Sequence, residues 1–172
     1  MFVTVIVFGF LWVAKSTIEA ERMQAVVPVR QDSSQENTDR KEQGAMYDGA
    51  HVKAVIGTTS VRAEIAQSDG KKALGLGNRE ALEKGTGMLF VFDEPSAYRF
   101  WNRDMRFPID MLWILNDRVV DLYEHLPTYA AEKDFTVTPQ APANFILEVP
   151  DGFIKENTIH IGDTIIYESE EN

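Results

Sequence analysis

The chain has 172 residues, enough for one domain with additional segments. Its net charge is −10, and residues 51–172 alone carry 12 basic against 20 acidic residues, which argues against a nucleic-acid or anionic-lipid surface because both need a basic face. There is no cysteine, so disulfides, thiolate nucleophiles and Cys-ligated zinc are excluded.

Residues 2–14 form an almost unbroken apolar run. The run is short for a membrane-spanning helix, which needs ~20 residues. The first positive side chain of the sequence, Lys15, comes after the run. Three interpretations of residues 1–15 stay open: a cleaved signal peptide, a retained membrane anchor, or a strand of the fold. The first two predict an extracytoplasmic domain, whether periplasmic, secreted or membrane-anchored, that meets the membrane only through this N-terminal segment.

Residues 16–50 are expected to form a disordered polar tether, because Gln31 to Gly44 contains no apolar residue that could offset the entropy of ordering. A flexible segment of about 30 residues spans ~30 Å. A tether has a clearer use when the N-terminus stays in the membrane, which slightly favours the anchor. The last residues, 169–172, are a polar tail.

The domain is expected over residues 51–168 and opens with two strands, at 53–58 and 61–67, joined by a turn at 57–60. Asp69 is the expected cap of a short helix that runs toward Leu76. A further helical turn is expected at 79–84, ended by Gly85.

The second half of the domain is predicted to consist mainly of short strands. The apolar run 87–92 indicates a strand buried on both faces, followed by a turn at 93–96. The remaining expected elements are strands at 97–102, 109–115, 119–124, 135–137, 145–149 and 163–168, a hairpin turn at Asn116-Asp117, and a helical turn at 150–156. The prediction is a mainly β (α+β) fold: a compact antiparallel, barrel-like β domain with one to three short helices.

The segment 99–115 is the densest aromatic stretch and contains most of the candidate binding residues. Polar groups beside an aromatic wall describe a small-molecule pocket, so Trp101, Asn102, Arg103, Asp104 and Asp110 are candidates. The alternative is structural: the arginines pair with the aspartates, as Arg103–Asp104 or Arg106–Asp110, and the aromatic residues belong to the core.

Glu148 is an acid inside an apolar strand, Ile-Leu-Glu-Val, and is a further candidate. It is either solvent-facing or buried and paired, with Arg103 or Arg79, which is also a candidate binding residue, as its partner. The histidines at positions 51, 125 and 160 lack metal-ligand spacing, so neither a metal nor a cofactor is expected.

Several stretches follow one another in a recognisable order: Gly75-Leu-Gly-Asn-Arg79, Gly87-Met-Leu-Phe-Val-Phe92, Phe100-Trp101 with an Arg-Asp-Met triplet, Pro108-Ile-Asp110, Phe145-Ile-Leu-Glu-Val149 with Asp151-Gly152, and Gly162-Asp163. Together they resemble the DUF192 family (COG1430) over about residues 52–168. The resemblance implies a compact β-rich domain, often behind a signal peptide or an anchor, of no established biochemical function. The chain departs from the family at Asn102, where many relatives have methionine, so a contact made there is expected to differ.

Three functional hypotheses follow. The leading one is an extracytoplasmic, monomeric module that binds a small polar ligand or an envelope component. The alternative is an envelope hydrolase that uses Asp104, Asp110 and Glu148 as acid and base, which requires two carboxyl groups about 5–10 Å apart around a cleft. A third is a protein-interaction domain that uses an apolar patch or a sheet edge. Whether the protein is an enzyme stays open.

Overall fold

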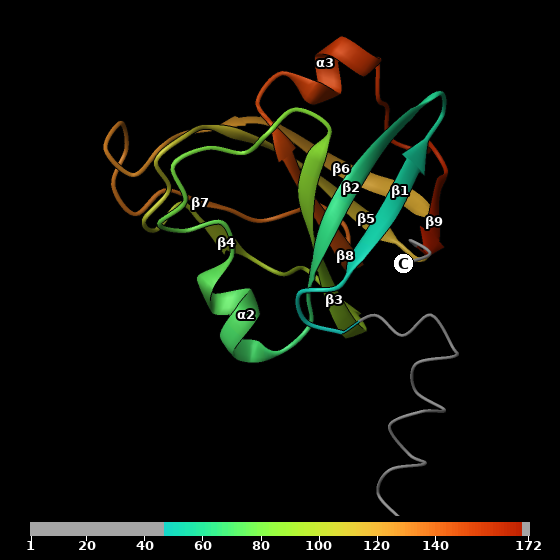
Figure 1. Ribbon diagram of the computed structural model, residues 1–172, viewed down its shortest axis with the longest axis horizontal. Coiled ribbons are helices and arrows are strands. Elements are labelled where there is room, and N and C mark those ends of the chain that lie inside the picture. The colour runs from blue at the N-terminus through green and yellow to red at the C-terminus, as the bar shows by residue number, and fades with distance from the viewer. Residues whose placement is uncertain (1–46, 170–172) are drawn as a thin grey trace, which may run out of the picture.

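The computed structural model describes residues 47–169, which form one curled seven-stranded sheet, a two-stranded sheet and two short helices (Figure 1). The strand order of the large sheet is β6-β5-β8-β3-β2-β1-β9, and every pairing is antiparallel except β2 with β3. Its strands are β1 (His51–Ile56), β2 (Thr59–Ala66), β3 (Thr86–Ser96), β5 (Ile109–Leu115), β6 (Arg118–Leu126), β8 (Ala143–Pro150) and β9 (Ile165–Ser169). The predicted β-rich fold with few helices is confirmed.

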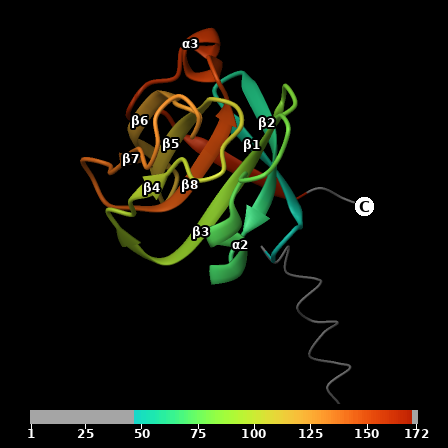
Figure 2. The same cartoon turned by 90° about the vertical axis from the view of Figure 1, so that its left-hand side faces the viewer.

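The small sheet pairs β4 (Phe100–Trp101) with β7 (Thr136–Val137). The helices are α2 (Asp69–Leu74) and α3 (Phe153–Asn157), and Figures 1 and 2 show them at opposite ends of the large sheet. Among residues 47–169, none of the helices has the length and apolar character needed to cross a membrane. The expected signal or anchor at 1–15 and most of the tether and tail lie outside the described residues.

The curl of the sheet brings its two outer strands together at one end. Arg118 at the start of β6 bridges Thr164 just before β9, and the amide of Ile165 donates to the carbonyl of Asp117 at 2.9 Å. The result is a half-barrel that is closed at this end and open elsewhere.

Alternating side chains of the strands build two apolar cores on the two faces of the sheet. The first contains Val61, Leu89, Leu112, Leu147 and Ile165, with residues of α3 packed on it. The second contains Met88, Phe90, Met111, Trp113 and Ile146, and is covered by the loops around α2, β4 and β7. β3 and β8 contribute to both cores. This explains why residues 87–92 of β3 are apolar without interruption, as expected for a strand buried on both faces.

Four local predictions are wrong. β3 continues through the expected turn at 93–96, because Ser96 still pairs with Ala143 after a shift in register. The expected strand at 97–102 shrinks to β4, which pairs with β7 outside the large sheet. Residues 79–84 form no helix, and α2 ends at Leu74. The cap of α2 is Ser68 rather than Asp69, since its hydroxyl accepts from the Lys71 amide at 3.2 Å.

Candidate functional site

A row of register partners crosses the middle of the sheet. Glu64 of β2 lies beside Met88 of β3, Met88 beside Glu148 of β8, and Glu148 beside Met111 of β5. Register partners on neighbouring strands point to the same face. The two glutamates therefore face the second core, two strands apart, with methionines around Glu148.

Glu148 is buried and incompletely hydrogen-bonded. It is 5% exposed, and its Oε2 has no hydrogen-bond partner within the described residues. Burial raises the pKa of Glu148 to about 8, although the nearby positive charge of Arg79 acts in the opposite direction. At neutral pH the carboxyl group is therefore mostly protonated, and a protonated carboxyl group donates a hydrogen bond as well as accepting one.

The Glu148 pocket is a narrow hollow of about 30 Å³ that has Glu148 among its lining residues. This volume exceeds the roughly 10–15 Å³ that one water needs, so it admits a single small polar group. Two apolar side chains of the lining are exposed: Trp101 by 50% and Leu74 by 54%. The other lining residues are Lys72, Ala73, Gly75, Leu76, Gly77, Phe90, Phe100, Arg103 and Met105.

The lining of this pocket is positively charged. Its cations are Lys72, whose Nζ lies 4.4 Å from the Phe92 ring centre, and Arg103, whose Cζ lies 4.3 Å from the Trp101 ring centre. Both distances are those of cation–π contacts, which hold the charge near an aromatic face. Glu148 is the only acid of the lining and is mostly neutral, so the pocket is suited to an anion.

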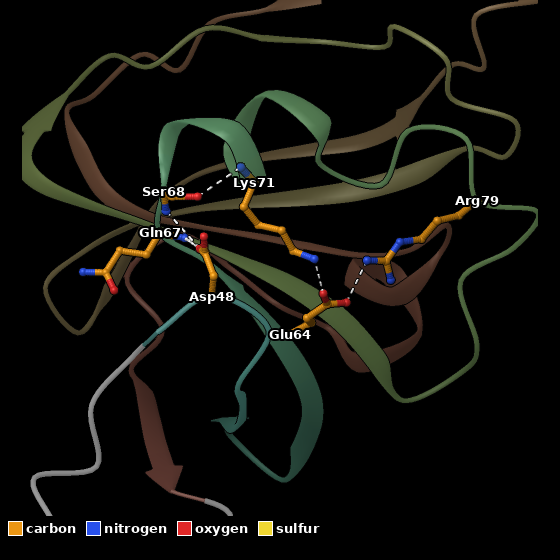
Figure 3. Close-up of polar contacts among 6 residues, drawn as sticks. All are labelled: Asp48, Glu64, Gln67, Ser68, Lys71 and Arg79. Carbon is orange, nitrogen blue, oxygen red and sulfur yellow. Dashed lines mark hydrogen bonds and ion pairs between the residues drawn. The ribbon is translucent and has the colours of Figure 1, made fainter. Parts of the chain in front are cut away.

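Glu64, which faces the same core as Glu148, is paired with two cations, Lys71 and Arg79 (Figure 3). One of its oxygens forms an ion pair with Lys71, and Oε2 accepts from Arg79 Nη2 at 2.7 Å. Burial would raise the pKa of Glu64, but the hydrogen bonds and charges of Lys71 and Arg79 outweigh it and lower the pKa. Two cations thus share the Glu64 carboxylate, and the charge of one of them, Arg79, also acts on Glu148.

Asp48 fixes the start of the helix that carries Lys71 and Lys72. Its Oδ1 accepts from the amides of Gln67 at 2.6 Å and Ser68 at 2.9 Å, as Figure 3 shows. Hydrogen bonding to Ser68 and Gln67 lowers the pKa of Asp48, so the carboxylate stays charged above mildly acidic pH. The amide of Gly49 also donates to the carbonyl of Ile65 in β2 at 3.0 Å, so contacts with the sheet begin before β1, within the last residues of the expected tether.

Two predicted site residues, Asn102 and Asp110, bind backbone groups. Both are fully buried. The Asn102 Nδ2 donates to the carbonyls of Pro127 at 3.1 Å and Glu132 at 2.6 Å, which fastens the loop between β6 and β7. The Asp110 oxygens accept from the amides of His125 at 3.0 Å and Ile154 at 2.9 Å, which joins the end of β6 to α3.

The three acids of the hydrolase hypothesis line no common pocket in the described part of the chain. Glu148 lines its own pocket, Asp110 is occupied by amides, and Asp104 lies exposed beside a separate hollow of about 370 Å³. The two ion pairs of the structural alternative do not form either: Arg106 pairs with Glu80, and Arg103 stacks on Trp101. Within residues 47–169, no group of three or more His, Cys, Asp or Glu residues is arranged to hold a metal ion.

The comparisons with known proteins identify the family. The model of the DUF192 family, described as "Uncharacterized ACR, COG1430", matches residues 52–167. The chain belongs to the DUF192 family. No curated protein matches this DUF192 chain.

Two solved structures are similar to this DUF192 domain. A proposed transcription regulator from Sinorhizobium meliloti 1021 has a TM-score of 0.63 and 21% identity, over 72% of this chain and 96% of the other. A protein of unknown function from Novosphingobium aromaticivorans DSM 12444 has a TM-score of 0.61 and 26% identity, over 67% of this chain and 83% of the other. The first likeness shows the fold alone.

The stretches that carry the DUF192 resemblance converge on the Glu148 pocket. Gly75 and Gly77, Phe90, Phe100-Trp101 and Glu148 come from four of them, and all line the pocket. The sequence thus pointed to Trp101, Arg103 and Glu148, but Lys72 and Leu74 were missed. The sequence signal was the pair Lys71-Lys72 on the predicted helix. Lysines on a short helix usually lie on an ordinary solvent-exposed surface, so the pair did not mark a site.

Proposed function

We propose that this DUF192 domain binds a small organic anion that has a flat apolar body and a hydroxyl or carbonyl oxygen. The observation that carries the proposal is the buried carboxyl group of Glu148, whose Oε2 lacks a partner in a pocket lined by Trp101, Lys72 and Arg103. Buried polar groups are almost always hydrogen-bonded, so an orphaned one in a pocket is a place for a ligand group.

The protonation of Glu148 selects the group that enters the pocket. A mostly neutral carboxyl group offers an O–H, which matches a hydroxyl or carbonyl oxygen, and the volume of about 30 Å³ admits only one such group. A ligand ammonium group is disfavoured, because Lys72 and Arg103 of the lining repel it.

The exposed lining residues of the Glu148 pocket determine which ligand body fits outside it. The exposed parts of the Trp101 and Leu74 side chains offer apolar area to a flat body, and the two cations offer partners to its negative charge. Charge-assisted contacts of this kind are the strong ones, so charge and stacking are expected to contribute most of the affinity.

The hydrolase alternative finds less support, because Asp104, Asp110 and Glu148 do not share a cleft. We therefore propose binding rather than catalysis. The extracytoplasmic location stays a proposal that rests on the apolar run at residues 2–14. It is tested by fractionating cells and locating the tagged full-length chain.

The binding proposal is tested with three probes on the full-length chain by isothermal titration calorimetry. The probes are 4-hydroxybenzoate, which combines charge, flat body and hydroxyl, benzoate, which lacks the hydroxyl, and phenol, which lacks the charge. We expect 4-hydroxybenzoate to bind most tightly. If none of the three binds, the assigned ligand class is wrong.

Two replacements of Glu148 separate hydrogen bonding from packing. Glu148→Gln keeps a donor and is expected to retain binding. Glu148→Leu keeps the size and is expected to raise the Kd for 4-hydroxybenzoate about tenfold, the effect of one lost hydrogen bond. Glu124→Leu on the exposed side of β6 is the matched control. Equal affinities in Glu148→Leu and the unmodified chain would place the ligand elsewhere.

A further inference from the structure

We infer that a second site, lined by Asn78, Asp104 and Tyr129, binds a neutral polyhydroxylated ligand such as a monosaccharide unit. The site is the hollow of about 370 Å³ beside Asp104, and its volume lies within the range of small-molecule pockets. Its lining is completed by Met105, Arg106, Thr128 and Ala130. The inference does not depend on the proposed function, because it uses another hollow and other polar groups.

Three loops are fastened together around this hollow by main-chain hydrogen bonds. The amide of Asn78 donates to the carbonyl of Asp104 at 3.0 Å, and the amide of Tyr129 donates to the carbonyl of Met105 at 3.0 Å. The bonds from Asn102 to the carbonyls of Pro127 and Glu132 hold the third loop from behind. The lining is therefore preorganised, which reduces the entropy lost when a ligand binds.

Three polar side chains of the hollow are available for a ligand. Within residues 47–169, the side chains of Asn78 and Asp104 and the hydroxyl of Tyr129 make no hydrogen bond. Both Asn78 and Asp104 adopt left-handed backbone conformations, with φ of 64° and 58°. Asn and Asp tolerate this conformation better than other non-glycine residues, so the turn chemistry places an amide and a carboxylate at adjacent points of one rim.

The charge balance of the lining favours a neutral ligand. Asp104 is its only acid and Arg106 its only base, and Arg106 is already paired with Glu80. Asp104 would repel an anion, and Arg106 would repel a cation. A neutral molecule with adjacent hydroxyls meets neither penalty, since each hydroxyl donates to the carboxylate or exchanges bonds with the Asn78 amide.

The aromatic ring of Tyr129 and the side chain of Met105 supply the apolar part of the lining. A pyranose ring has polar edges and apolar C–H faces, so it requires both kinds of surface together. Tyrosine provides an apolar face and a hydroxyl in one rigid side chain. Carboxylate, amide and tyrosine on fixed loops are thus a fitting set for a sugar unit.

The test is saturation-transfer NMR of the full-length chain with methyl glucoside, methyl galactoside, methyl mannoside and N-acetylglucosamine, each titrated separately. We expect at least one to bind saturably, and its Kd to rise about tenfold or more in Asp104→Asn, because a hydrogen bond to a charged group is lost. Asparagine keeps the size and the left-handed backbone, so this variant is expected to fold. Tyr129→Phe is the second variant, with a smaller rise in Kd.

The matched control is Asp117→Asn, an exposed aspartate in the β5–β6 turn at the other end of β5. It is expected to leave the Kd unchanged. If no sugar binds, or if a sugar binds equally to Asp104→Asn and the unmodified chain, the inference is overturned. Neither outcome bears on 4-hydroxybenzoate at the Glu148 pocket, because that test reads a different ligand and different variants.

Discussion

Arg79 is hydrogen-bonded to Glu64 at 2.7 Å, and Glu148, two strands away, is left with only its electrostatic influence. Of the two partners expected for Glu148, Arg79 is occupied by another acid and Arg103 lies on Trp101. The buried carboxyl group therefore avoids ionisation by keeping its proton, the usual response of an acid that lacks a counter-ion in an apolar site.

The pH dependence of stability is predicted to depend strongly on Glu148. Its pKa is about 8 in the folded chain against 4.5 for an ordinary glutamate, so the folded state binds more protons between these values. The free energy of unfolding is therefore highest below pH ~4.5 with respect to this group and falls as the pH rises toward 8, by on the order of 5 kcal/mol. Glu148→Gln is expected to lack this fall.

The measurement is urea unfolding of both chains at a series of pH values from about 5 to 9, a range in which the folded-state carboxyl group of Glu148 loses its proton. Other groups contribute to both curves, so the difference between the curves isolates Glu148. Glu124→Gln, at an exposed position of β6, should follow the unmodified chain. Parallel curves for Glu148→Gln and the unmodified chain would show that Glu148 ionises normally.

Gly87 is predicted to tolerate no side chain. A Cβ at this position would lie 2.6 Å from the carbonyl oxygen of Glu148 and 2.9 Å from Val61 Cγ1. Because the first contact is with backbone of the neighbouring strand, Gly87→Ala is expected to lower the free energy of unfolding by about 1–3 kcal/mol or more. The check is the urea midpoint of the full-length chain.

Gly70 provides the matched comparison. It lies in α2, and a Cβ there meets nothing within 4 Å. Gly70→Ala is expected to raise the free energy of unfolding by roughly 0.5–1 kcal/mol, because alanine is the better helix former. An equal effect of the two substitutions would contradict the close approach of β3 and β8 at Gly87.

Asp110 is predicted to be a structural residue rather than a ligand contact. Asparagine at this position offers one oxygen to the two amides of His125 and Ile154, and its NH₂ group faces a donor. Asp110→Asn is expected to cost about 2–4 kcal/mol of stability, since a buried donor loses its partner. The urea midpoint measures this, and binding of 4-hydroxybenzoate to the folded fraction should be unchanged.

Asp121 is the control for burial. It also accepts from two amides, those of Leu122 at 2.8 Å and Gln140 at 2.6 Å, but it is partly exposed. Water can replace a lost acceptor there, so Asp121→Asn should have a clearly smaller effect than Asp110→Asn. Similar losses for both would mean that burial does not set the importance of Asp110.

Local sequence patterns predicted the elements whose structure is locally determined. The alternation of Val61, Ala63 and Ile65 predicted β2, and Asn116-Asp117 predicted the β5–β6 hairpin. The end of β3 was not predictable in this way, because its last pairing, Ser96 with Ala143, depends on a strand 47 positions further along the chain. The parallel pairing of β2 with β3 is likewise set by the path of the intervening loop.

The candidate site was predictable in composition but not in geometry. The sequence marked Trp101, Arg103 and Glu148, which the fold places around one pocket. It also marked Asp110, whose amide partner in α3 is 44 residues away, and Asn102, whose partners are 25 and 30 residues away. Only the tertiary structure determines which acid faces a pocket and which binds backbone amides, because each is an acid or amide beside apolar residues.

Tyr167 of β9 is predicted to be better replaced by phenylalanine. Its hydroxyl is buried without a hydrogen-bond partner in the described residues, and burial raises the pKa of this phenol above its ordinary value. Removal of an unpaired buried hydroxyl eliminates a desolvation penalty, so Tyr167→Phe is expected to raise the free energy of unfolding by about 1 kcal/mol. Its ring contact with Phe145, at 5.3 Å between centres, is retained.

Tyr98→Phe is the matched substitution with the opposite expectation, because the Tyr98 hydroxyl donates to the carbonyl of Glu94 at 2.7 Å. Loss of that bond should lower stability by roughly 0.5–1 kcal/mol, and urea unfolding of the two variants side by side decides whether the Tyr167 hydroxyl is unpaired in solution.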